Sequence, residues 1–266
     1  MSGLTLGPFS FSAGLLTTFA AMLAVLVIGK RVARGRASEP ETALWLIIAA
    51  ALLAARAFYV FIYAGLYAAS PLSALDIRDG GFHLTAGLCA GLATAALLAW
   101  RQRDRALALL AGAGAGAAVF GVAALAALAM PAPTVRLPQM TLARLEGGTL
   151  AFAALAGKPV VINLWASWCG PCRREMPVMR QAQLDNPNVT FIFVNQGETP
   201  AQIGAYLLAQ RIALDNIVLD ARPGLAHALG TKALPATFFF DSNGVLTSRR
   251  VGELSAATLA ERLPAP

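Results

Sequence analysis

Two cysteines separated by two residues carry the most specific chemistry in this sequence. Cys169 and Cys172 enclose Gly170 and Pro171 directly after a short apolar run. Cysteines three residues apart lie one helical turn from each other, so their sulfurs can bond without moving the backbone. The start of a helix offers unpaired N–H groups and the positive end of the helix dipole, which favour a thiolate. We therefore expect Cys169 to be an exposed nucleophile and Cys172 to be the shielded resolving cysteine.

A metal site and a structural disulfide are the alternatives for this pair. A structural zinc ion takes four nitrogen or sulfur ligands, but this half of the chain has no second cysteine pair and only one histidine, His227. A disulfide that closes so short a loop adds little stability. We expect no metal and no cofactor beyond the redox-active disulfide Cys169–Cys172, because C-x-x-C in a strand–helix–strand context is typical of redox sites.

The segments around the pair alternate between strand and helix patterns. Val160–Trp165 is a short β-branched run typical of a buried strand, and a helix is predicted from the cysteines to about Leu184. The alternation, which ends in a hairpin and a helix, predicts an α/β domain with a central mixed sheet. The other predicted elements are strands at Phe191–Asn195 and Ile217–Leu219, helices at Pro200–Arg211, Pro223–Leu229 and Ser255–Leu263, and a hairpin of Thr237–Phe240 and Val245–Val251.

The composition indicates that the first half of the chain crosses a membrane. Hydrophobic residues make up 57% of the 266 residues and charged residues 13%, whereas soluble domains carry about 25% charged residues. This excludes a disordered chain and an ordinary all-soluble protein. A spanning helix needs about 20 apolar residues. Four windows reach that length: Phe11–Gly29, Ala43–Tyr67, Phe82–Trp100 and Ala106–Met130.

Charge distribution predicts the orientation of these four spans. Basic residues gather in the first and third connections, which places both in the cytoplasm. The N-terminus and everything after Met130 then lie outside, in the periplasm or its equivalent at a bacterial inner membrane. The basic excess is similar in both halves, so we expect a lipid bilayer but no nucleic acid as a partner. The basic residues are Lys30, Arg31, Arg34 and Arg36 in the first connection, and Arg101, Arg103 and Arg105 in the third.

We expect three regions along the chain: a transmembrane domain over 1–130, a proline-rich linker over 131–138, and the α/β domain over 139–266. Gly87/Gly91 and Gly112/Gly116 have the spacing that lets helices approach closely. Cys89, alone in the membrane part, cannot relay electrons and is expected to pack as a small apolar residue.

Arg56 lies within the second span, where an ionised side chain needs a partner. The segment around it, Ala55–Val60, together with Asp79–His83 further on, resembles prolipoprotein diacylglyceryl transferase over about residues 10–100. The Gly-Arg-x-Gly-Asn-Phe-x-Asn-x-Glu signature of that family is absent, so the resemblance implies an anchor or docking module. Under that interpretation Arg56 pairs with a loop carboxylate or a carbonyl, and His83 is structural rather than catalytic.

The second half resembles the membrane-tethered thioredoxin-like proteins of the TlpA/ResA type. The motifs are Gly157–Pro159, Val160–Pro177, Ala233–Phe238 and the turn Asp241–Gly244, within a match over about 137–263. The resemblance implies a thioredoxin-like fold after the α-helical four-span membrane domain, and a thiol-disulfide oxidoreductase activity.

The resemblance also assigns roles to individual residues. Pro235 matches a cis-proline facing the disulfide, and Glu175 matches an acid that could take a proton or raise a cysteine pKa. Trp168, Gly170, Pro171 and Leu234 are expected to form the surface on which a substrate docks. Thioredoxin has a buried Asp at the position of Asn163, so proton transfer to Cys172 must use Glu175, water or, less directly, Glu198. A solvated position is the alternative for Glu175.

The direction of electron flow rests on the dipeptide between the cysteines. Gly-Pro is shared with thioredoxin, a reductant at about −270 mV, which favours a disulfide reductase. Expected partners are oxidised cysteines of exported proteins, such as those of cytochrome c maturation or copper-site assembly, and an external membrane thiol donor. A thiol oxidase using the same pair, a lipid-transferase-like membrane module with a regulatory redox domain, and a scaffold with a vestigial pair remain open.

Overall fold

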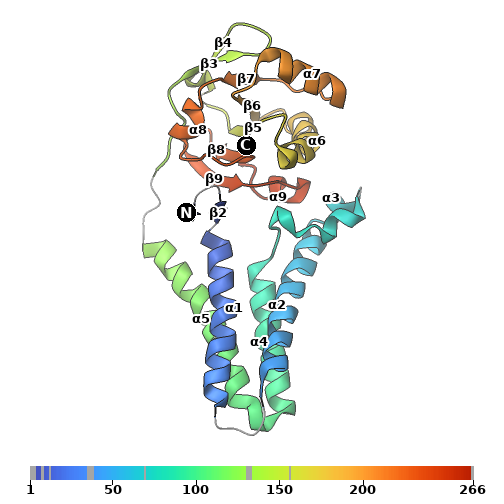
Figure 1. The fold of residues 1–266 in the computed structure, drawn as a ribbon, viewed down its shortest axis with the longest axis vertical. Coiled ribbons are helices and arrows are strands. Elements are labelled where there is room, and N and C mark those ends of the chain that lie inside the picture. Colours follow the sequence, from blue (N-terminus) through green and yellow to red (C-terminus); the bar gives the residue numbers. More distant parts are fainter. Residues whose placement is uncertain are drawn as a thin grey trace. The chain divides into compact units, whose positions relative to one another are not determined.

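The protein is described by a computed structural model that covers residues 4–6, 9–11, 13–34, 39–68, 70–129, 134–155 and 157–264. The chain divides into two compact units (Figure 1). The first unit comprises residues 1–74 and 81–132, and the second comprises residues 133–266 together with 75–80. The first three residues of the predicted linker, 131–133, lie outside the described residues.

Four helices of the first unit are long and apolar enough to cross a membrane. The predicted windows match them to within a few residues, except that the second is interrupted by a turn at Tyr63. The helices are α1 (Ala13–Ala33), α2 (Glu41–Ile62), α4 (Leu84–Arg101) and α5 (Ala106–Ala129). Shorter elements are strands β1 (Leu4–Leu6) and β2 (Phe9–Phe11), helix α3 (Ala64–Ala68), and 3-10 turns at Pro71–Leu75, Ile77–Asp79 and Arg103–Arg105.

Glycines allow these helices to pack closely in pairs. Helix α1 packs mainly on α5, and α2 mainly on α4. A Cβ atom at Gly112 of α5 would lie 2.8 Å from the carbonyl oxygen of Val25 on α1, and one at Gly87 of α4 would lie 3.0 Å from the carbonyl oxygen of Ala51 on α2. Backbones this close leave room only for glycine. Both predicted glycine pairs therefore lie at helix interfaces.

Cys89 was predicted to pack, and this prediction is wrong, because the residue is exposed. Gly87 and Gly91 of α4 are buried, and Gly87 faces α2. Residues of a helix turn by about 100° each, so a residue midway between two that face inward points away. Cys89 lies on that outward face of α4.

Arg56 binds main-chain carbonyl groups, one of the two predicted alternatives. Its Nε donates to the Ala74 carbonyl oxygen at 3.0 Å, and its guanidinium donates to the carbonyl oxygens of Gly81 at 2.8 Å and Ser73 at 3.4 Å. His83 caps α4, since its Nδ1 accepts a hydrogen bond from the N–H of Ala86 at 3.3 Å. Arg56 thereby ties the connection between α2 and α4 to the body of α2.

The second unit is built on a seven-stranded mixed sheet with the strand order β4-β3-β7-β6-β5-β8-β9. Strands β5, β6 and β7 are parallel, and the other pairings are antiparallel. The strands are β3 (Thr141–Arg144), β4 (Thr149–Ala151), β5 (Val160–Trp165), β6 (Thr190–Gln196), β7 (Ile217–Asp220), β8 (Ala236–Phe240) and β9 (Leu246–Val251).

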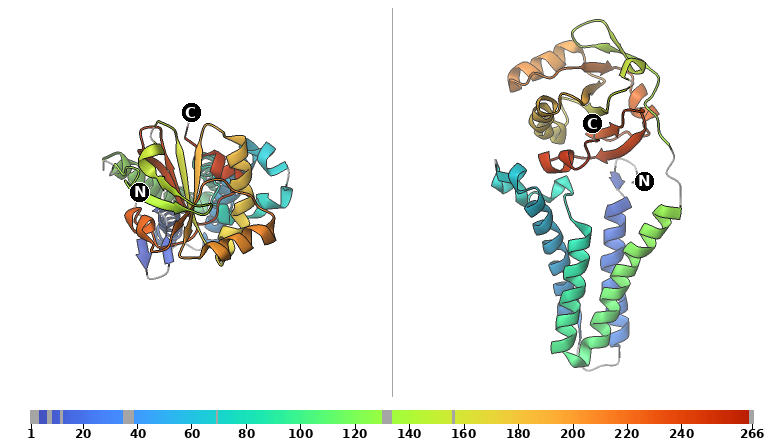
Figure 2. Two further views of the ribbon diagram at one scale, coloured as in Figure 1. Left: turned by 90° about the horizontal axis from the view of Figure 1, so that it is seen from above. Right: turned by 180° about the vertical axis from the view of Figure 1, so that it is seen from behind.

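Helices cover both faces of this sheet and bury two separate cores. One core contains residues of α6 (Gly170–Asp185), α7 (Pro200–Gln210) and α9 (Ala256–Ala260), and the other contains residues of α8 (Gly224–Ala228). Figure 2 shows α6 and α7 on one side of the sheet and α8 on the other. Because β5 lies between β6 and β8 and under both cores, all six of its residues are buried, as its apolar run predicts.

The helix starts follow from local capping. Thr199 and Ser255 each accept a hydrogen bond from a backbone N–H in the first turn of α7 and α9 and form a capping box there. Both caps agree with the predicted helix starts, although α9 ends at Ala260 rather than near Leu263. Strands β3 and β4 were not predicted, and Gly147 and Gly148 between them, both with positive φ, are the turn signal that was overlooked.

The segment that enters the second unit is itself joined to the sheet. The N–H of Leu137 donates to the Gly244 carbonyl oxygen at 2.8 Å, and the N–H of Leu246 donates to the Val135 carbonyl oxygen at 2.8 Å. Arg136 forms an isolated antiparallel bridge with Val245. The side chain of Leu137 is buried in the α8-side core. Residues 135–137 therefore behave as a short strand alongside the β8–β9 hairpin.

We predict that Gly112→Ala destabilises the first unit by about 1–3 kcal/mol, the usual cost of overpacking, since the added methyl group would meet the backbone of Val25. Gly114→Ala is the matched control, because nothing lies within 4 Å of a Cβ atom there. It should be neutral or stabilising, since alanine favours helices. Thermal unfolding in detergent micelles, followed by circular dichroism, measures both. Equal unfolding temperatures for the two variants would contradict the assignment.

Candidate active site

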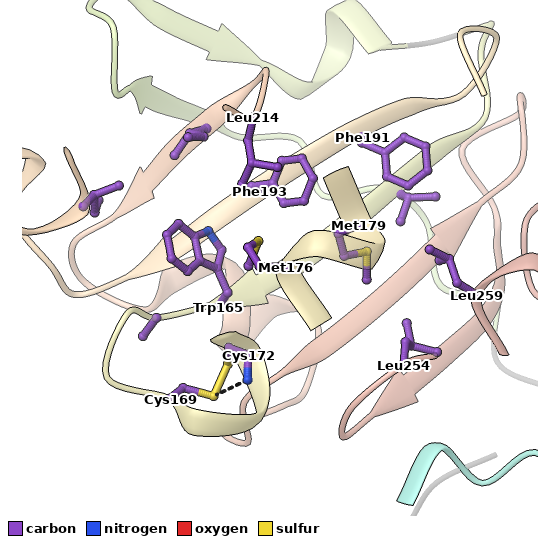
Figure 3. Close-up of a cluster of buried hydrophobic side chains, with 14 of the residues drawn as sticks. Trp165, Cys169, Cys172, Met176, Met179, Phe191, Phe193, Leu214, Leu254 and Leu259 are labelled. Atoms are coloured by element: carbon purple, nitrogen blue, oxygen red, sulfur yellow. Dashed lines mark hydrogen bonds between the residues drawn. A yellow bond between two sulfur atoms is a disulfide. The ribbon is translucent and has the colours of Figure 1, made fainter. Parts of the chain in front are cut away.

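The two cysteines form a disulfide at the first turn of α6. The sulfurs are 2.04 Å apart and the Cα atoms 5.2 Å apart. Cys169 is the N-cap residue of α6, and its Sγ accepts a hydrogen bond from the N–H of Cys172 at 3.2 Å (Figure 3). Gly170 begins the helix and Pro171 occupies its first turn, where a missing N–H has no cost. The sequence thus places one sulfur at the positive end of a helix.

The two sulfurs differ in their access to solvent. Cys169 is 5% exposed and Cys172 is fully buried, so Cys169 is the more accessible cysteine but is less exposed than we expected. The disulfide lies at one margin of the core formed by Trp165, Met176 and their neighbours (Figure 3). Trp168 is 69% exposed beside it, whereas Trp165 is buried. Only one of the two tryptophans can therefore contact a protein partner directly.

The loop before β8 reaches the same end of the sheet. The Leu234–Pro235 peptide bond is cis, the conformation that the resemblance implies. Ala236, the next residue, pairs with Leu164, which is the residue before the end of β5. Because the chain continues from Trp165 of β5 to Cys169 in only four residues, the register brings Leu234 and Pro235 to the edge at which the disulfide lies.

Glu175 is buried, so the alternative of a solvated helix carboxylate is wrong. Only 1% of the residue is exposed. One carboxylate oxygen accepts a hydrogen bond from Asn163 Nδ2 at 2.8 Å, and the other accepts one from the N–H of Leu254 at 3.0 Å. Burial disfavours the charged form and raises the pKa of Glu175 to about 8, although the Asn163 hydrogen bond opposes the shift.

The position of Glu175 makes it available for proton transfer. It follows Cys172 by three residues on α6, so both side chains lie on one face of the helix and face the core on β5. A pKa near 8 allows the carboxyl to gain or lose a proton close to neutral pH, as a general acid or base requires. The resemblance to the TlpA/ResA type pointed to this residue, but the sequence did not show that it is buried.

Glu198 holds the loop that leads to Cys169. One of its carboxylate oxygens accepts hydrogen bonds from the N–H of Ser167 at 2.7 Å and from Asn195 Nδ2 at 2.7 Å. The other accepts a hydrogen bond from the Ser167 hydroxyl. Glu198 therefore acts on the active-site loop through Ser167, which gives it a positioning role that sequence reasoning missed. The signal was an acidic residue just after a strand parallel and adjacent to β5.

Among the described residues, no three His, Cys, Asp or Glu side chains come together as metal ligands would. The two carboxylates of this region accept hydrogen bonds from the protein, Glu175 from Asn163 and Leu254 and Glu198 from Ser167 and Asn195. The arrangement suits thiol-disulfide exchange, in which the reacting atoms are the two sulfurs.

Comparison with known proteins identifies the class to which this site belongs. The second unit is a thioredoxin-like domain of the thiol-disulfide oxidoreductases. The profile of the Redoxin family matches residues 128–262, half of the chain, so the chain belongs to the Redoxin family. The first part matches prolipoprotein diacylglyceryl transferase over residues 4–127, in line with the resemblance noted in the sequence.

Individual relatives agree with this membership. The chain is 32% identical to the thiol-disulfide oxidoreductase ResA of Geobacillus thermodenitrificans, over 47% of this chain and 73% of the relative. It is 32% identical to the thiol:disulfide interchange protein DsbE of Pseudomonas fluorescens biotype C, over 44% of this chain and 65% of the relative. A crystal structure of a thioredoxin-family thiol:disulfide interchange protein from Chlorobium tepidum is 27% identical, covers 50% of this chain and 97% of its own, and has a TM-score of 0.45.

The raised pKa of Glu175 predicts how stability depends on pH. In the folded protein the pKa of the Glu175 carboxyl is raised to about 8, whereas the ordinary pKa of a glutamate is 4.5. The folded protein therefore keeps the proton of this carboxyl up to about pH 8. The stability that the group contributes is therefore full below pH 4.5 and falls as pH rises towards 8. Each pKa unit corresponds to about 1.4 kcal/mol, so the fall should reach a few kcal/mol.

Glu175→Gln should remove this loss of stability at higher pH. Unfolding temperatures of the full chain in micelles, measured between pH 5 and pH 8 through the fluorescence of the second unit, test this expectation. The exposed Glu146 supplies the control, since Glu146→Gln should keep the original pH dependence. An unchanged slope in Glu175→Gln would contradict the buried position of this carboxyl group.

We predict that Glu198→Ala frees the loop before Cys169. The N–H of Ser167 loses a charged acceptor, and such a hydrogen bond contributes about 1.5–3 kcal/mol. Hydrogen exchange of the Ser167 amide should become at least about tenfold faster. Gln202→Ala breaks the capping box of α7 nearby without touching Ser167 and should leave this rate unchanged. The same acceleration in both variants would mean that Glu198 has no specific role.

Proposed function

We propose that this protein is a membrane-tethered thiol-disulfide reductase that acts on exported proteins outside the cytoplasm. The observation that carries the proposal is the cysteine pair at the head of α6, with one sulfur more accessible than the other. A buried acid on the same helix, Glu175, supplies a site for a proton. The relatives named ResA and DsbE support thiol-disulfide exchange as the reaction.

The proposed reaction begins from the reduced protein. The Cys169 thiolate attacks one sulfur of a substrate disulfide, so that a mixed disulfide forms and the other substrate sulfur leaves as a thiolate. Cys172 then loses its proton, either to water or to Glu175 in those molecules whose Glu175 carboxyl is ionised, and attacks Cys169 Sγ. This step restores the disulfide of the protein and releases the second substrate thiol. Two electrons pass from the protein to the substrate, and two protons complete the substrate thiols.

The residues around the pair have assigned parts in this reaction. Gly170 and Pro171 leave the first turn of α6 without bulky side chains beside Cys169. Trp168 presents its ring to the substrate, and the main chain of Leu234, before Pro235, is available to pair with an extended substrate segment. Glu198 keeps the loop before Cys169 in place.

Direction and electron supply follow from the Gly-Pro dipeptide and the compartment. Thioredoxin, which has the same dipeptide, is a reductant at about −270 mV. Outside the cytoplasm the surroundings are oxidising, so a membrane thiol protein must reduce the pair after each cycle. Cysteines of exported proteins, including haem-binding cysteines of apocytochromes c and copper-site cysteines, are the proposed substrates.

The proposed orientation rests on the ends of the helices in the first unit. Lys30 and Arg31 lie in the last turn of α1, and Arg101 lies in the last turn of α4. Arg103 and Arg105 follow in the connection to α5. These basic connections favour the cytoplasm, which supports the proposal that the C-terminal end of α5 and the redoxin domain lie on the other side. Arg36, also used in the prediction, lies outside the described residues.

Two other functions make different predictions. A thiol oxidase would have a reduction potential above about −150 mV, near the value of strong oxidants. A lipid-transferase-like membrane unit is favoured only by the match over residues 4–127, and it would lose lipoprotein modification in Arg56→Ala with both cysteines intact. The three hydrogen bonds from Arg56 to main-chain carbonyls instead support an anchoring role for the first unit.

We predict that Cys172→Ser accumulates mixed disulfides with its substrates, because no second thiol is present to release them. Cys169→Ser should form none and should lose disulfide reductase turnover. Cys89→Ser is the control and should behave as the unmodified protein, since Cys89 lies on α4, in the first unit. Non-reducing electrophoresis after expression in a bacterium, followed by mass spectrometry of the captured protein, tests these outcomes. Full complementation of the cell by a double-serine variant would contradict the proposal.

A further inference from the structure

The end of the sheet that carries the disulfide has an unusual balance of charge. We define the redox edge as the residues that follow the carboxyl ends of β5, β6 and β7 and those that precede β8. Parallel strands end at the same edge of a sheet, and β7 lies only two strands from β5. Neighbouring strands are about 4.8 Å apart, so the end of β7 lies roughly 10 Å from the end of β5, the strand that leads to Cys169.

Three basic side chains on the redox edge are exposed and form no ion pair with any described carboxylate. Arg173 follows Cys172 in the first turn of α6, Arg222 follows the end of β7, and Lys232 precedes the cis Leu234–Pro235 bond. The Arg173 guanidinium lies over the ring of Tyr206, 5.8 Å from its centre. The three charges therefore come from three different segments of the redox edge.

The acidic residues of the same region are all engaged. Glu175 is buried, and Glu198 accepts three hydrogen bonds from Ser167 and Asn195. Asp220 is 3% exposed and accepts hydrogen bonds from three N–H groups at the start of α8 and from Gln196. Glu253 forms a bidentate pair with Arg174, with a shortest N–O distance of 2.6 Å.

The half-buried basic residues Arg249 and Arg250 lie near the end of β9, and Arg250 pairs in register with Thr237 of β8. Both of these residues are basic, so β9 does not offset the positive charge of the redox edge. The edge therefore presents a positive field around an exposed aromatic ring, that of Trp168.

From this balance we propose that the redox edge selects partners whose disulfides are flanked by acidic residues. This inference rests on the proposed function and adds the class of substrate. A positive surface raises the rate at which a negative segment arrives, by about tenfold to a thousandfold at low salt, and it disfavours a positive one. The aromatic ring of Trp168 supplies apolar contact at the centre of the surface, and the three basic residues supply charge at its rim.

The test uses the reduced full-length protein in nanodiscs of phosphatidylcholine, so that the lipid adds no net charge. Three cyclic peptides share one disulfide and differ only in flanking residues, which are glutamates, serines or lysines. A fluorophore and a quencher separate when the disulfide opens, and stopped-flow fluorescence gives the second-order rate constants. The rate for each charged peptide is divided by that for the serine peptide, which removes any change in the reactivity of Cys169.

At about 0.01 M salt, where charges act over about 30 Å, the glutamate peptide should react at least about tenfold faster than the lysine peptide. The combined variant Arg173→Glu, Arg222→Glu and Lys232→Glu should reverse this order. Lys158→Glu changes an exposed charge just before β5, at the opposite edge of the sheet, and should leave the ratios unchanged. At about 0.15 M salt, with a range near 8 Å, the preference should shrink.

Equal ratios for the two charged peptides at low salt, or a reversal by Lys158→Glu alone, would overturn this inference. The proposed function is tested separately by the serine peptide. If the serine peptide is reduced, and the glutamate and lysine peptides react at equal rates, the reductase assignment stands and the acidic selectivity fails. If the serine peptide is not opened at all by the reduced protein, the reductase assignment fails first.

Discussion

The complete burial of strand β5 is the constraint on which the redox site depends. A strand that is covered on both faces and paired on both sides has one possible register, because a slip of one residue would exchange its two faces. The position of Trp165, and with it that of Cys169, the N-cap of α6 four residues later, is therefore fixed. The same strand sets Ala236 opposite Leu164 and Asn163 against Glu175. A sulfur and an acid of α6 and a proline from a distant segment thus take their places from one strand.

Two opposite electrostatic effects operate along the first turns of α6. At its head, the helix end and nearby basic side chains favour a negative sulfur on Cys169. One turn into the helix beyond Cys172, burial disfavours a negative carboxyl on Glu175 and raises its pKa. The site therefore separates a group that tends to be charged from a group that tends to hold a proton, over a short length of one helix.

Local patterns were sufficient to predict most of the fold. The apolar run of β5, the starts of the helices at Pro200 and Ser255, and the four apolar windows each depend on neighbours in sequence, and each prediction agrees with the structure to within a few residues. Contacts between distant segments were not predictable in the same way. The burial of Glu175 requires the N–H of Leu254, and the role of Glu198 requires Ser167 from another loop. Cys89 was misplaced because sequence alone does not say which face of α4 meets α2.

The strand-like segment at residues 135–137 has a practical consequence for any soluble form of the redoxin domain. A truncated protein that began after Leu137 would leave the Gly244 carbonyl and the Leu246 N–H without their partners. It would also remove a buried leucine from the core beneath α8. Such a fragment would expose a bare sheet margin open to pairing with a second copy. A fragment that retains Val135 would keep that margin covered.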